Sequence, residues 1–342
     1  MKKTILLFLV MLLLTGCGAA DTETKQTGAA PKADDDSKIK IGMSFDSFVI
    51  ERWIRDRDIF VSTAESLGAE VNVQSANGDP EEQIEQIRYL VSDGADVIVV
   101  VAVDCEGLTD VIKEVKSRGI EVISYDRLIL NSGTDLYISF DNEEVGYLMG
   151  KTLTDNLSEG DKVFRIEGPL TDNNVTQVDN GYERAVNGKG LDEVYVARCD
   201  KWNALSGYDY AKEALTRYPD VKGIMCGNDD IASQVYKALS EMRLSGKVIL
   251  TGQDGDLLAC QRVVEGTQEV TVFKSVEEEA GKAAECAVAM AEGKELPYDT
   301  KTRNDGIYDV PSLELSPVAV TQENIDEVII DGGYHARNEL YK

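Results

Sequence analysis

The sequence predicts an α/β protein built from two Rossmann-like lobes, each with a parallel, doubly wound sheet. Short runs of continuous apolar residues alternate with longer segments of helical periodicity, which is the pattern of βα units. This alternation runs from residue 38 to about residue 126 and starts again at residue 161. A chain of 342 residues is long enough for two lobes that each bury a core.

The first run contains the βα units of the predicted N-terminal lobe. Its strands are apolar without alternation, so we expect them to be buried on both faces, parallel and joined by right-handed crossovers. Each helix ends at a glycine, as a left-handed C-cap prefers. The expected elements are strands at residues 38–45, 70–76, 95–103 and 120–126, and helices at residues 51–68, 79–94 and 107–119.

The second run predicts the C-terminal lobe. It follows a segment at residues 135–160 after which the strand and helix pattern starts again. Two such lobes leave a cleft between them, and open α/β sheets bind ligands at the carboxyl ends of their strands. The expected elements are strands at residues 161–168, 191–199, 221–228 and 247–255, and helices at residues 173–188, 205–219 and 230–246.

The side chains at these strand ends are carboxylates, amides, guanidinium groups and an ammonium group. Such groups form bidentate hydrogen bonds to neighbouring hydroxyls. A sugar presents a rim of hydroxyls around C–H faces that pack on aromatic rings, and Trp53, Trp202 or Tyr208 could supply the rings. The strand-end residues are Asp46, Glu51, Arg52, Trp53, Asp126, Arg127, Asp172, Asn174, Asn228, Asp229, Asp254 and Lys274.

Each strand-end residue also has a purely structural interpretation. Asp126 and Arg127 could form an ion pair at a sheet edge. Asn228 could cap the helix that follows it, and Asp254 could belong to turn chemistry. The ligand hypothesis depends on the coincidence that strand ends from both lobes carry side chains suited to the same polyol.

Composition excludes several classes of partner. The formal net charge is −27, and no basic block offsets it, so the chain would be repelled by nucleic acid and by an anionic membrane surface. We therefore expect no nucleic-acid partner. Apart from Cys17, the five cysteines are an odd number without C-x-x-C spacing, which predicts neither a zinc site nor a disulfide framework.

The N-terminus has the features of a targeting signal. Residues 1–16 combine a basic start with an apolar stretch too short to span a bilayer comfortably, which predicts a signal peptide. The ending "LTGC" resembles the lipobox of bacterial lipoproteins, in which the cysteine, here Cys17, is lipidated. Residues 17–37 have the polar composition of a flexible tether. We expect an extracytoplasmic protein that is lipid-anchored to the cell membrane.

An enzyme is the competing class. The single histidine, His335, lies near the C-terminus, so a histidine-dependent triad would depend on a tail position. A glycosidase needs only two carboxylates and is not excluded by composition. "GMSFDSF" follows the first strand where a glycine-rich phosphate loop would stand. We expect no catalytic residues, no cofactor and no metal site, although a carboxylate calcium site needs no histidine.

Several segments together resemble the pentose/hexose periplasmic-binding-protein family of bacterial ABC importers, and its xylose binders in particular. The resemblance runs from about Lys38 to about His335. It implies a type I periplasmic binding protein, whose two lobes are joined by a three-strand hinge and close over one monosaccharide. The segments are "KIGMSFD", "ERWIRDRDIFV", "AESLGAEVNVQSANGDPEEQIEQI", "ISYDRLI", "LYISFDNEEVG", "DNN", "GNDD", "LSGKVILTGQD", "GTQEVTVFKS" and "DVPSLEL…VIIDGGYH".

The resemblance also implies lobe boundaries and sugar contacts. The N-terminal lobe would comprise residues 38–141 and 275–308, and the C-terminal lobe residues 142–274 and 309–342. Hinge crossings are expected near Asp141, Lys274 and Asp309. The implied sugar contacts are Arg52, Trp53, Asp126, Arg127, Asp172, Asn174, Asn228, Asp254 and Lys274.

One departure from the family pattern concerns the ligand. The xylose binders carry a second tryptophan four residues after the one that matches Trp202, and here that position is Ser206. Either Tyr208 or Trp202 takes over that face of the sugar, or the pocket is wider. Xylose is the leading ligand, while glucose, arabinose or another monosaccharide stays open.

The expected protein partner is the one that binds the closed form, and the sequence leaves its identity open. An ABC permease would receive the sugar, whereas a sensor histidine kinase would respond to closure without transport. A secreted carbohydrate-active enzyme is the third alternative. A cytoplasmic repressor shares the two-lobe core, but a helix-turn-helix head is missing. We expect a monomer.

Overall fold

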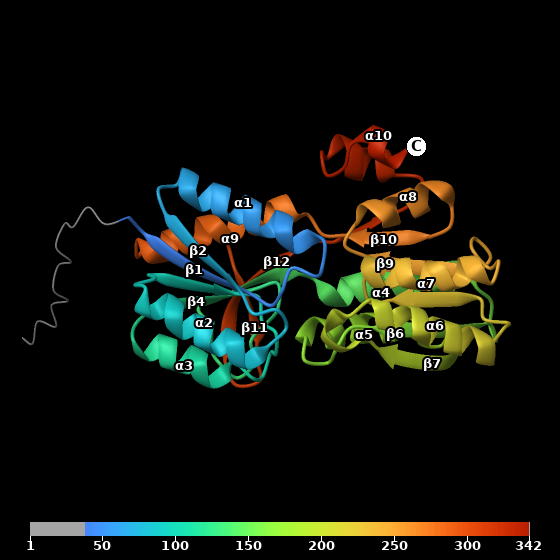
Figure 1. Ribbon diagram of the computed structural model, residues 1–342, viewed down its shortest axis with the longest axis horizontal. Coiled ribbons are helices and arrows are strands. Elements are labelled where there is room, and N and C mark those ends of the chain that lie inside the picture. Colours follow the sequence, from blue (N-terminus) through green and yellow to red (C-terminus); the bar gives the residue numbers. More distant parts are fainter. Residues whose placement is uncertain (1–37, 342) are drawn as a thin grey trace, which may run out of the picture. The chain divides into compact units, whose positions relative to one another are not determined.

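The computed structural model describes residues 38–341, and Lys38–Lys342 form one compact unit. The predicted signal peptide, Cys17 and the tether lie outside the described residues. The compact unit contains two sheets with helices on both faces, in agreement with the predicted α/β fold class (Figure 1). No helix in the described part of the chain is long and apolar enough to cross a membrane.

The N-terminal lobe contains a seven-stranded sheet. Six neighbouring strands are parallel, and their order β2-β1-β3-β4-β5-β12 reverses direction between β1 and β3. The strands, in their order across the sheet, are β11 (Lys301–Asn304), β12 (Asp309–Leu315), β5 (Leu136–Phe140), β4 (Glu121–Tyr125), β3 (Val97–Val100), β1 (Lys40–Phe45) and β2 (Glu70–Ser75).

The C-terminal lobe contains a six-stranded sheet with a matching order. Its parallel strands follow β7-β6-β8-β9-β10, so the order reverses between β6 and β8. The strands, in order, are β13 (Val318–Val320), β10 (Val270–Phe273), β9 (Ile249–Gln253), β8 (Gly223–Cys226), β6 (Lys162–Glu167) and β7 (Asp192–Arg198).

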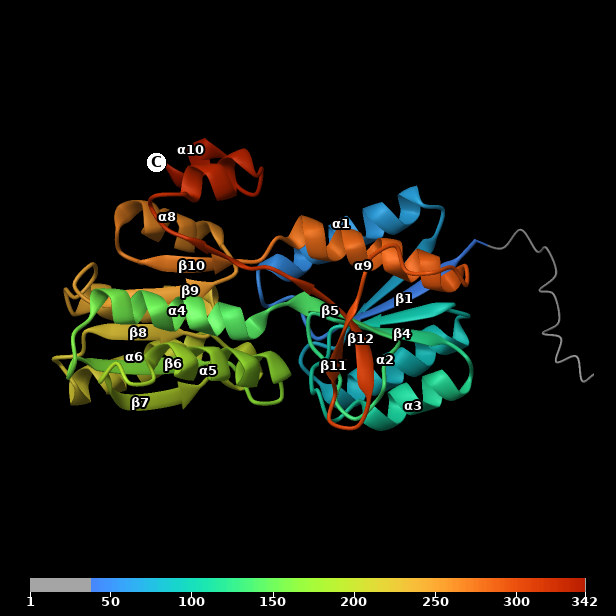
Figure 2. The same ribbon diagram turned by 180° about the vertical axis from the view of Figure 1, so that it is seen from behind.

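Helices cover both faces of each sheet. In the N-terminal lobe α1 packs on α9, and α2 packs on α3 on the opposite face (Figure 2). In the C-terminal lobe the pairs are α4 with α5 and α6 with α7. The helices are α1 (Arg52–Ser66), α2 (Pro80–Ser92), α3 (Thr109–Ser117), α4 (Asn142–Asn156), α5 (Asn173–Val186), α6 (Leu205–Arg217), α7 (Asp229–Glu241), α8 (Leu257–Glu265), α9 (Val276–Ala291) and α10 (Arg337–Leu340), with a 3-10 turn at Asp200–Trp202 and a π-helical turn at Asp326–Asp331.

Local sequence signals account for these elements. Strand β3 reads VIVV and is buried on both faces, as a central parallel strand requires. Helix α2 begins after Asp79, whose Oδ1 accepts hydrogen bonds from the N–H groups of Glu81 and Glu82, with Pro80 at its first position. Gly94 follows this helix with φ +88°, a left-handed conformation that glycine adopts without strain.

Two glycines bring helices α4 and α5 into backbone contact. A Cβ atom on Gly146 would overlap the carbonyl oxygen of Val178, and a Cβ atom on Gly181 would overlap that of Glu143. The two helices therefore touch through their main chains, and neither helix has room for a larger residue at the contact. Helix α5 begins beside the cleft, so this contact also positions the cleft wall.

The chain passes between the two sheets at three places. Strand β5 ends at Phe140 and α4 begins at Asn142, and strand β10 ends at Phe273 before α9 returns to the N-terminal lobe. The third passage was expected near Asp309, but Asp309–Leu315 pairs with β5 in the seven-stranded sheet. The chain therefore leaves that sheet after Leu315 and enters the other sheet at Val318.

Two edge pairs are antiparallel, although the sequence pattern predicts parallel sheets. Strand β12 pairs with β11, and β13 pairs with β10. In the first pair a tight turn reverses the chain, since Asp305 Oδ1 accepts hydrogen bonds from the N–H groups of Ile307 and Tyr308. A short turn of this kind can join antiparallel strands but not parallel ones.

Candidate functional site

A cavity lies between the lobes, at the carboxyl ends of the central strands. It faces the points where the strand order reverses in each sheet, which is where open α/β sheets bind ligands. All nine residues that the sequence suggested as ligand contacts line this cavity; their role in binding remains a prediction. They are Arg52, Trp53, Asp126, Arg127, Asp172, Asn174, Asn228, Asp254 and Lys274.

Arg52 stands at the first position of α1 and is fully buried. Its Nε donates to Asp56 Oδ2 (3.0 Å), and its Nη2 donates to Asp56 Oδ1 (2.8 Å) and to Glu279 Oε2 (2.5 Å). Burial alone would lower the pKa of Arg52, but Asp56 and Glu279 outweigh that effect and hold the pKa well above its ordinary value. Arg52 is therefore a fixed cation in the cavity wall.

Asp126 and Arg127 follow strand β4 and face both lobes. Arg127 Nη1 donates to Asp46 Oδ2 (2.7 Å) and to the carbonyl of Ala102 (2.9 Å) in its own lobe. Its Nε lies 2.8 Å from Asp172 Oδ2 of the other lobe, as an ion pair whose N–H is not aligned on the oxygen. The buried charge of Arg127 is thus balanced from both sides of the cleft.

The Asp172 carboxylate makes three contacts at the start of α5. Its Oδ1 caps the helix by accepting from the N–H of Asn174 (2.9 Å), and its Oδ2 accepts from Trp202 Nε1 (3.1 Å) and pairs with Arg127. Burial raises the pKa of Asp172, and Arg127 opposes this effect. Asn174 Nδ2 donates to Asp126 Oδ1 (2.8 Å), which joins the two lobes again.

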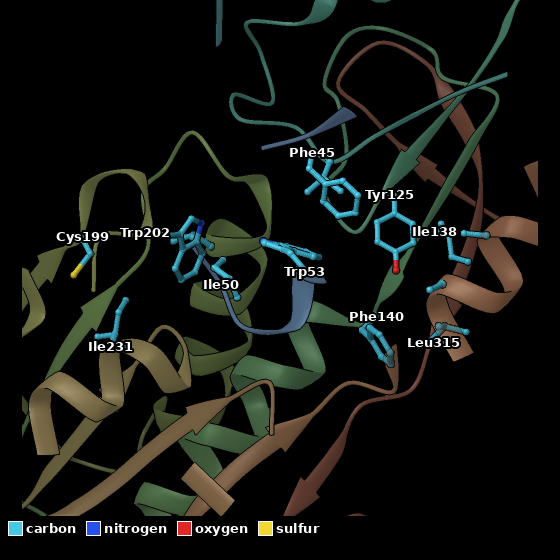
Figure 3. Packing of buried hydrophobic residues seen from close by; sticks show 14 of the residues in the cluster. Phe45, Ile50, Trp53, Tyr125, Ile138, Phe140, Cys199, Trp202, Ile231 and Leu315 are labelled. Atoms are coloured by element: carbon cyan, nitrogen blue, oxygen red, sulfur yellow. The ribbon is translucent and has the colours of Figure 1, made fainter. Parts of the chain in front are cut away.

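Two indoles contribute flat apolar faces, one from each lobe. Figure 3 shows Trp53 and Trp202 near each other with Ile50 beside them, and all three line the cavity. Trp202 is held against Gly168, where an added Cβ would overlap the indole. Lys201 and Trp202 both have left-handed backbones, with φ of 51° and 56°. Such strain in non-glycine residues clusters at functional sites.

The same strained backbone occurs at two of the cavity aspartates. Asp126 has φ +60° and Asp254 has φ +104°. Aspartate tolerates this region better than most residues, but it still costs energy there. Asp254 Oδ1 lies 2.8 Å from Lys274 Nζ, and Asp254 and Asp126 hold the pKa of Lys274 above its ordinary value against the opposing effect of burial. This ion pair joins the residue after β9 to the residue after β10.

Four cavity side chains each keep one buried polar atom with neither a hydrogen-bond nor an ion-pair partner within residues 38–341. The donors are Trp53 Nε1 and Asn228 Nδ2, and the acceptors are Asn174 Oδ1 and Gln253 Oε1. Buried polar groups in native proteins almost always have partners. The cavity therefore matches a ligand that both donates and accepts hydrogen bonds.

Other strand-end residues lie outside the cavity. Asp46 supports Arg127, and Glu51 is exposed. Asp229 is buried behind the site, where its carboxylate accepts from the N–H groups of Gly255 and Asp256 and so holds the Asp254 turn. Asn228 does cap α7, since its Oδ1 accepts from the N–H of Ile231 (2.9 Å). Its remaining amide group faces the cavity.

Tyr208 was expected as a possible sugar platform, and the structure contradicts this. Its hydroxyl donates to Glu241 Oε2 (2.7 Å), and its ring lies under Lys237 on the surface of α6. Ser206 is half-buried on the same helix and does not line the cavity. Trp202 is therefore the aromatic residue that the C-terminal lobe presents.

Sequence reasoning missed several cavity residues. Gln253 and Glu167 are strand-end residues that the same argument could have found, because each is the last residue of a parallel strand. Glu167 belongs to a network with Arg165, Arg198 and Asp179, and burial raises its pKa to about 8. Asn142, Val175 and Val178 lie on helices, where no strand-end signal exists.

The two lobes are in direct contact around the cavity. The N–H of Cys105 donates to the carbonyl of Thr171 (2.8 Å), and Arg303 Nη2 donates to Gln177 Oε1 (2.7 Å). Together with the Asn174–Asp126 contact, these bonds hold the N-terminal lobe against the C-terminal lobe. The cavity is thus enclosed by both lobes rather than carried by one.

Between residues 38 and 341 no group of three histidine, cysteine, aspartate or glutamate side chains is arranged to hold a metal ion. Cys105, Cys199, Cys226, Cys260 and Cys286 are buried free thiols. They pack as small apolar residues.

Two Rossmann-like lobes that enclose a polar cavity with unpaired donors and acceptors define a two-lobed ligand-binding protein. A family described as "Periplasmic binding protein domain" matches residues 41–295. The chain belongs to this periplasmic-binding-protein family.

Relatives from several bacteria support this assignment. The chain is 40% identical to the "D-xylose-binding periplasmic protein" of Escherichia coli (strain K12) over 96% of this chain and 98% of that protein. It is 31% identical to the "Multiple sugar-binding periplasmic receptor ChvE" of Rhizobium radiobacter, over 88% of this chain and 92% of that protein. These relatives are binding proteins, which removes the enzyme alternative.

A solved structure agrees with the fold. The ABC transporter solute-binding protein from Clostridium phytofermentans with bound β-D-glucose has a TM-score of 0.81 at 27% identity. The match covers 88% of this chain and 99% of that chain.

We predict that Gly168→Ala weakens ligand binding without unfolding the protein. The new methyl group would push the Trp202 indole out of its place, so the indole would lose its hydrogen bond to Asp172. Loss of one charge-assisted hydrogen bond corresponds to ~1.5–3 kcal/mol. Isothermal titration with D-xylose measures the change, and an unaltered Kd would contradict the assigned role of Trp202. Gly281→Ala is a control for glycine replacement, because nothing lies near its Cβ position and its backbone is helical.

Proposed function

We propose that this protein is an extracytoplasmic substrate-binding protein that captures a monosaccharide, with D-xylose as the first candidate, and delivers it to an ABC permease. The observation that carries the proposal is the set of unpaired donors and acceptors in the cavity that Trp53 and Trp202 line. Each sugar hydroxyl can donate and accept one of these bonds. The indoles offer faces for the C–H side of the sugar ring.

Closure explains how binding is communicated. The cavity has walls from both lobes, so a sugar in it contacts Arg52 and Trp53 on one side and Asn228 and Asp254 on the other. A ligand shifts a conformational equilibrium only through contacts that differ between the two states. Contacts to both lobes exist together only when the lobes are closed, so the sugar favours the closed form.

The names of the relatives support a choice of candidate sugar. Two relatives at 40% identity are named as D-xylose-binding, while ChvE is named as a multiple sugar-binding receptor. D-xylose is therefore the first candidate. Because Ser206 stands where the xylose binders carry a second tryptophan, a hexose such as D-glucose is the second candidate.

We also propose how the protein is held at the membrane. Residues 1–16 are a cleaved signal peptide, and Cys17 carries a lipid that anchors the mature chain through the tether at 17–37. Two-lobed capture needs no second copy, so the protein works as a monomer beside its permease.

Thermal unfolding tests the proposal. A ligand that binds only the folded state adds RT ln(1 + [L]/Kd), about 2.7 kcal/mol at a hundred times Kd, and so raises the unfolding midpoint. We expect the unit Lys38–Lys342 to be stabilised by D-xylose in a panel of pentoses, hexoses and amino acids. A rise only with another sugar would correct the ligand, and no rise with any sugar would refute the proposal.

A further inference from the structure

The guanidinium of Arg52 is held in one orientation by two carboxylates that do not belong to the cavity wall. Its Nε and both hydrogens of Nη2 are used by Asp56 and Glu279. Its Nη1 has one long contact, at 3.4 Å, to Asp126 Oδ2. Because Nη1 carries two hydrogens, it is the end of the group that can donate to a ligand in the cavity.

Glu279 comes from a distant part of the chain. It lies one turn into α9, just after the passage from the C-terminal lobe at Lys274 and Ser275. Asp56 lies one turn along α1 from Arg52 and also accepts a hydrogen bond from the Tyr125 hydroxyl. Asp56 and Glu279 are fully buried, and neither lines the cavity.

We infer that Glu279 is a positioning residue for sugar binding, which acts by orienting Arg52 so that Nη1 points into the cavity. This inference rests on the function proposed above. Segment 274–279, which crosses the hinge, would then hold the site in both lobes. Lys274 pairs with Asp254, and Glu279 binds Arg52. Asp56 binds the edge of the guanidinium formed by Nε and Nη2, and Glu279 accepts the second hydrogen of Nη2.

The cluster around Arg52 contains more negative than positive groups. Arg52 is one cation among three carboxylates, those of Asp56, Asp126 and Glu279. Burial raises the pKa of Glu279 well above its ordinary value; Arg52 opposes this, while Asp126 and Asp56 add to it. The contact that orients the guanidinium is the hydrogen bond from Arg52 Nη2 to Glu279 Oε2. Glutamine offers the same oxygen.

Three variants in the unit Lys38–Lys342 test the inference with D-xylose and D-glucose as probes. Glu279→Leu removes the acceptor, and we expect the sugar Kd to rise ~10- to 100-fold, the loss of one hydrogen bond to a charged group. Glu279→Gln should restore the Kd to within a few-fold of that of the parent protein. Asp305→Ala is the control, because Asp305 is a buried carboxylate of the same lobe that binds only turn N–H groups. It should lower the unfolding midpoint and leave the Kd unchanged.

A double-mutant cycle with Arg52→Ala separates positioning from general destabilisation. If Glu279 acts through Arg52, Glu279→Leu should have no further effect on the Kd in the Arg52→Ala background. Additive effects, or an unchanged Kd in Glu279→Leu, would overturn the inference. If Arg52→Ala weakens sugar binding but Glu279→Leu does not, the site assignment survives and the inference fails. If the parent protein binds neither sugar, the proposed function fails, and the inference falls with it.

Discussion

Replacement of Arg127 by alanine should weaken D-xylose binding by ~2–5 kcal/mol, a factor of roughly 30 to several thousand in Kd. Arg127 pairs with Asp46 in its own lobe and with Asp172 in the other. Its removal leaves two buried carboxylates without their cation and deletes a donor that faces the cavity. Asp46 loses its partner whether the lobes are open or closed, whereas the Asp172 contact crosses the cleft, so that part of the cost falls on the closed form.

Isothermal titration calorimetry of Arg127→Ala, with unfolding measured in parallel, checks this prediction. Lys116→Ala is the control, since Lys116 is a half-buried cation of the same lobe that pairs with Asp135 away from the cavity. The control should lose stability but keep its sugar affinity. Asp254→Ala should resemble Arg127→Ala, because it leaves Lys274 without its partner. Unchanged affinity in both Arg127→Ala and Asp254→Ala would refute the site assignment.

Gly181→Ala should destabilise the folded protein by ~3 kcal/mol, at the upper end of the usual cost of overpacking. The added methyl group would overlap the carbonyl of Glu143 across the α4–α5 contact, and a backbone atom cannot swing aside as a side chain does. The helices would have to separate, which would also move Asp172 and Asn174 at the start of α5. We therefore expect sugar affinity to fall along with stability.

Chemical denaturation measures this effect, and the chain supplies its own control. Gly281 lies inside α9 with open space at its Cβ position. Gly281→Ala should raise the free energy of unfolding by ~0.5–1 kcal/mol, because alanine favours a helix interior over glycine. Equal behaviour of the two variants would contradict the close helix contact.

The carboxyl ends of the strands could be found from the sequence because parallel strands bring their ends to one edge. This rule placed Asp126, Asn228 and Asp254 beside one another although they lie far apart in the chain. It also included Asp46 and Asp229, which support cavity residues from behind. Strand-end position shows where a side chain starts but not which way it turns.

The remaining features depend on backbone conformation and on long-range pairing. Trp202 reaches the cavity through a left-handed turn at Lys201 and Trp202, which no periodicity reveals. Tyr208 has the same chemistry as a sugar platform but lies on the outer face of α6. The position of β12 depends on its pairing with β5, residues that are distant in sequence.

The three passages between the lobes limit how this protein can move. Strand β12 lies beside β5 in one sheet, and β13 lies beside β10 in the other, so the third passage connects strands adjacent to the other two. Three connections that lie side by side favour bending of the two lobes about one hinge. A single distance across the cleft, for example between dyes attached to α2 and α6, would then report the fractional saturation directly. The same hinge geometry suits the protein to an optical sensor in which the distance between two dyes reports sugar binding.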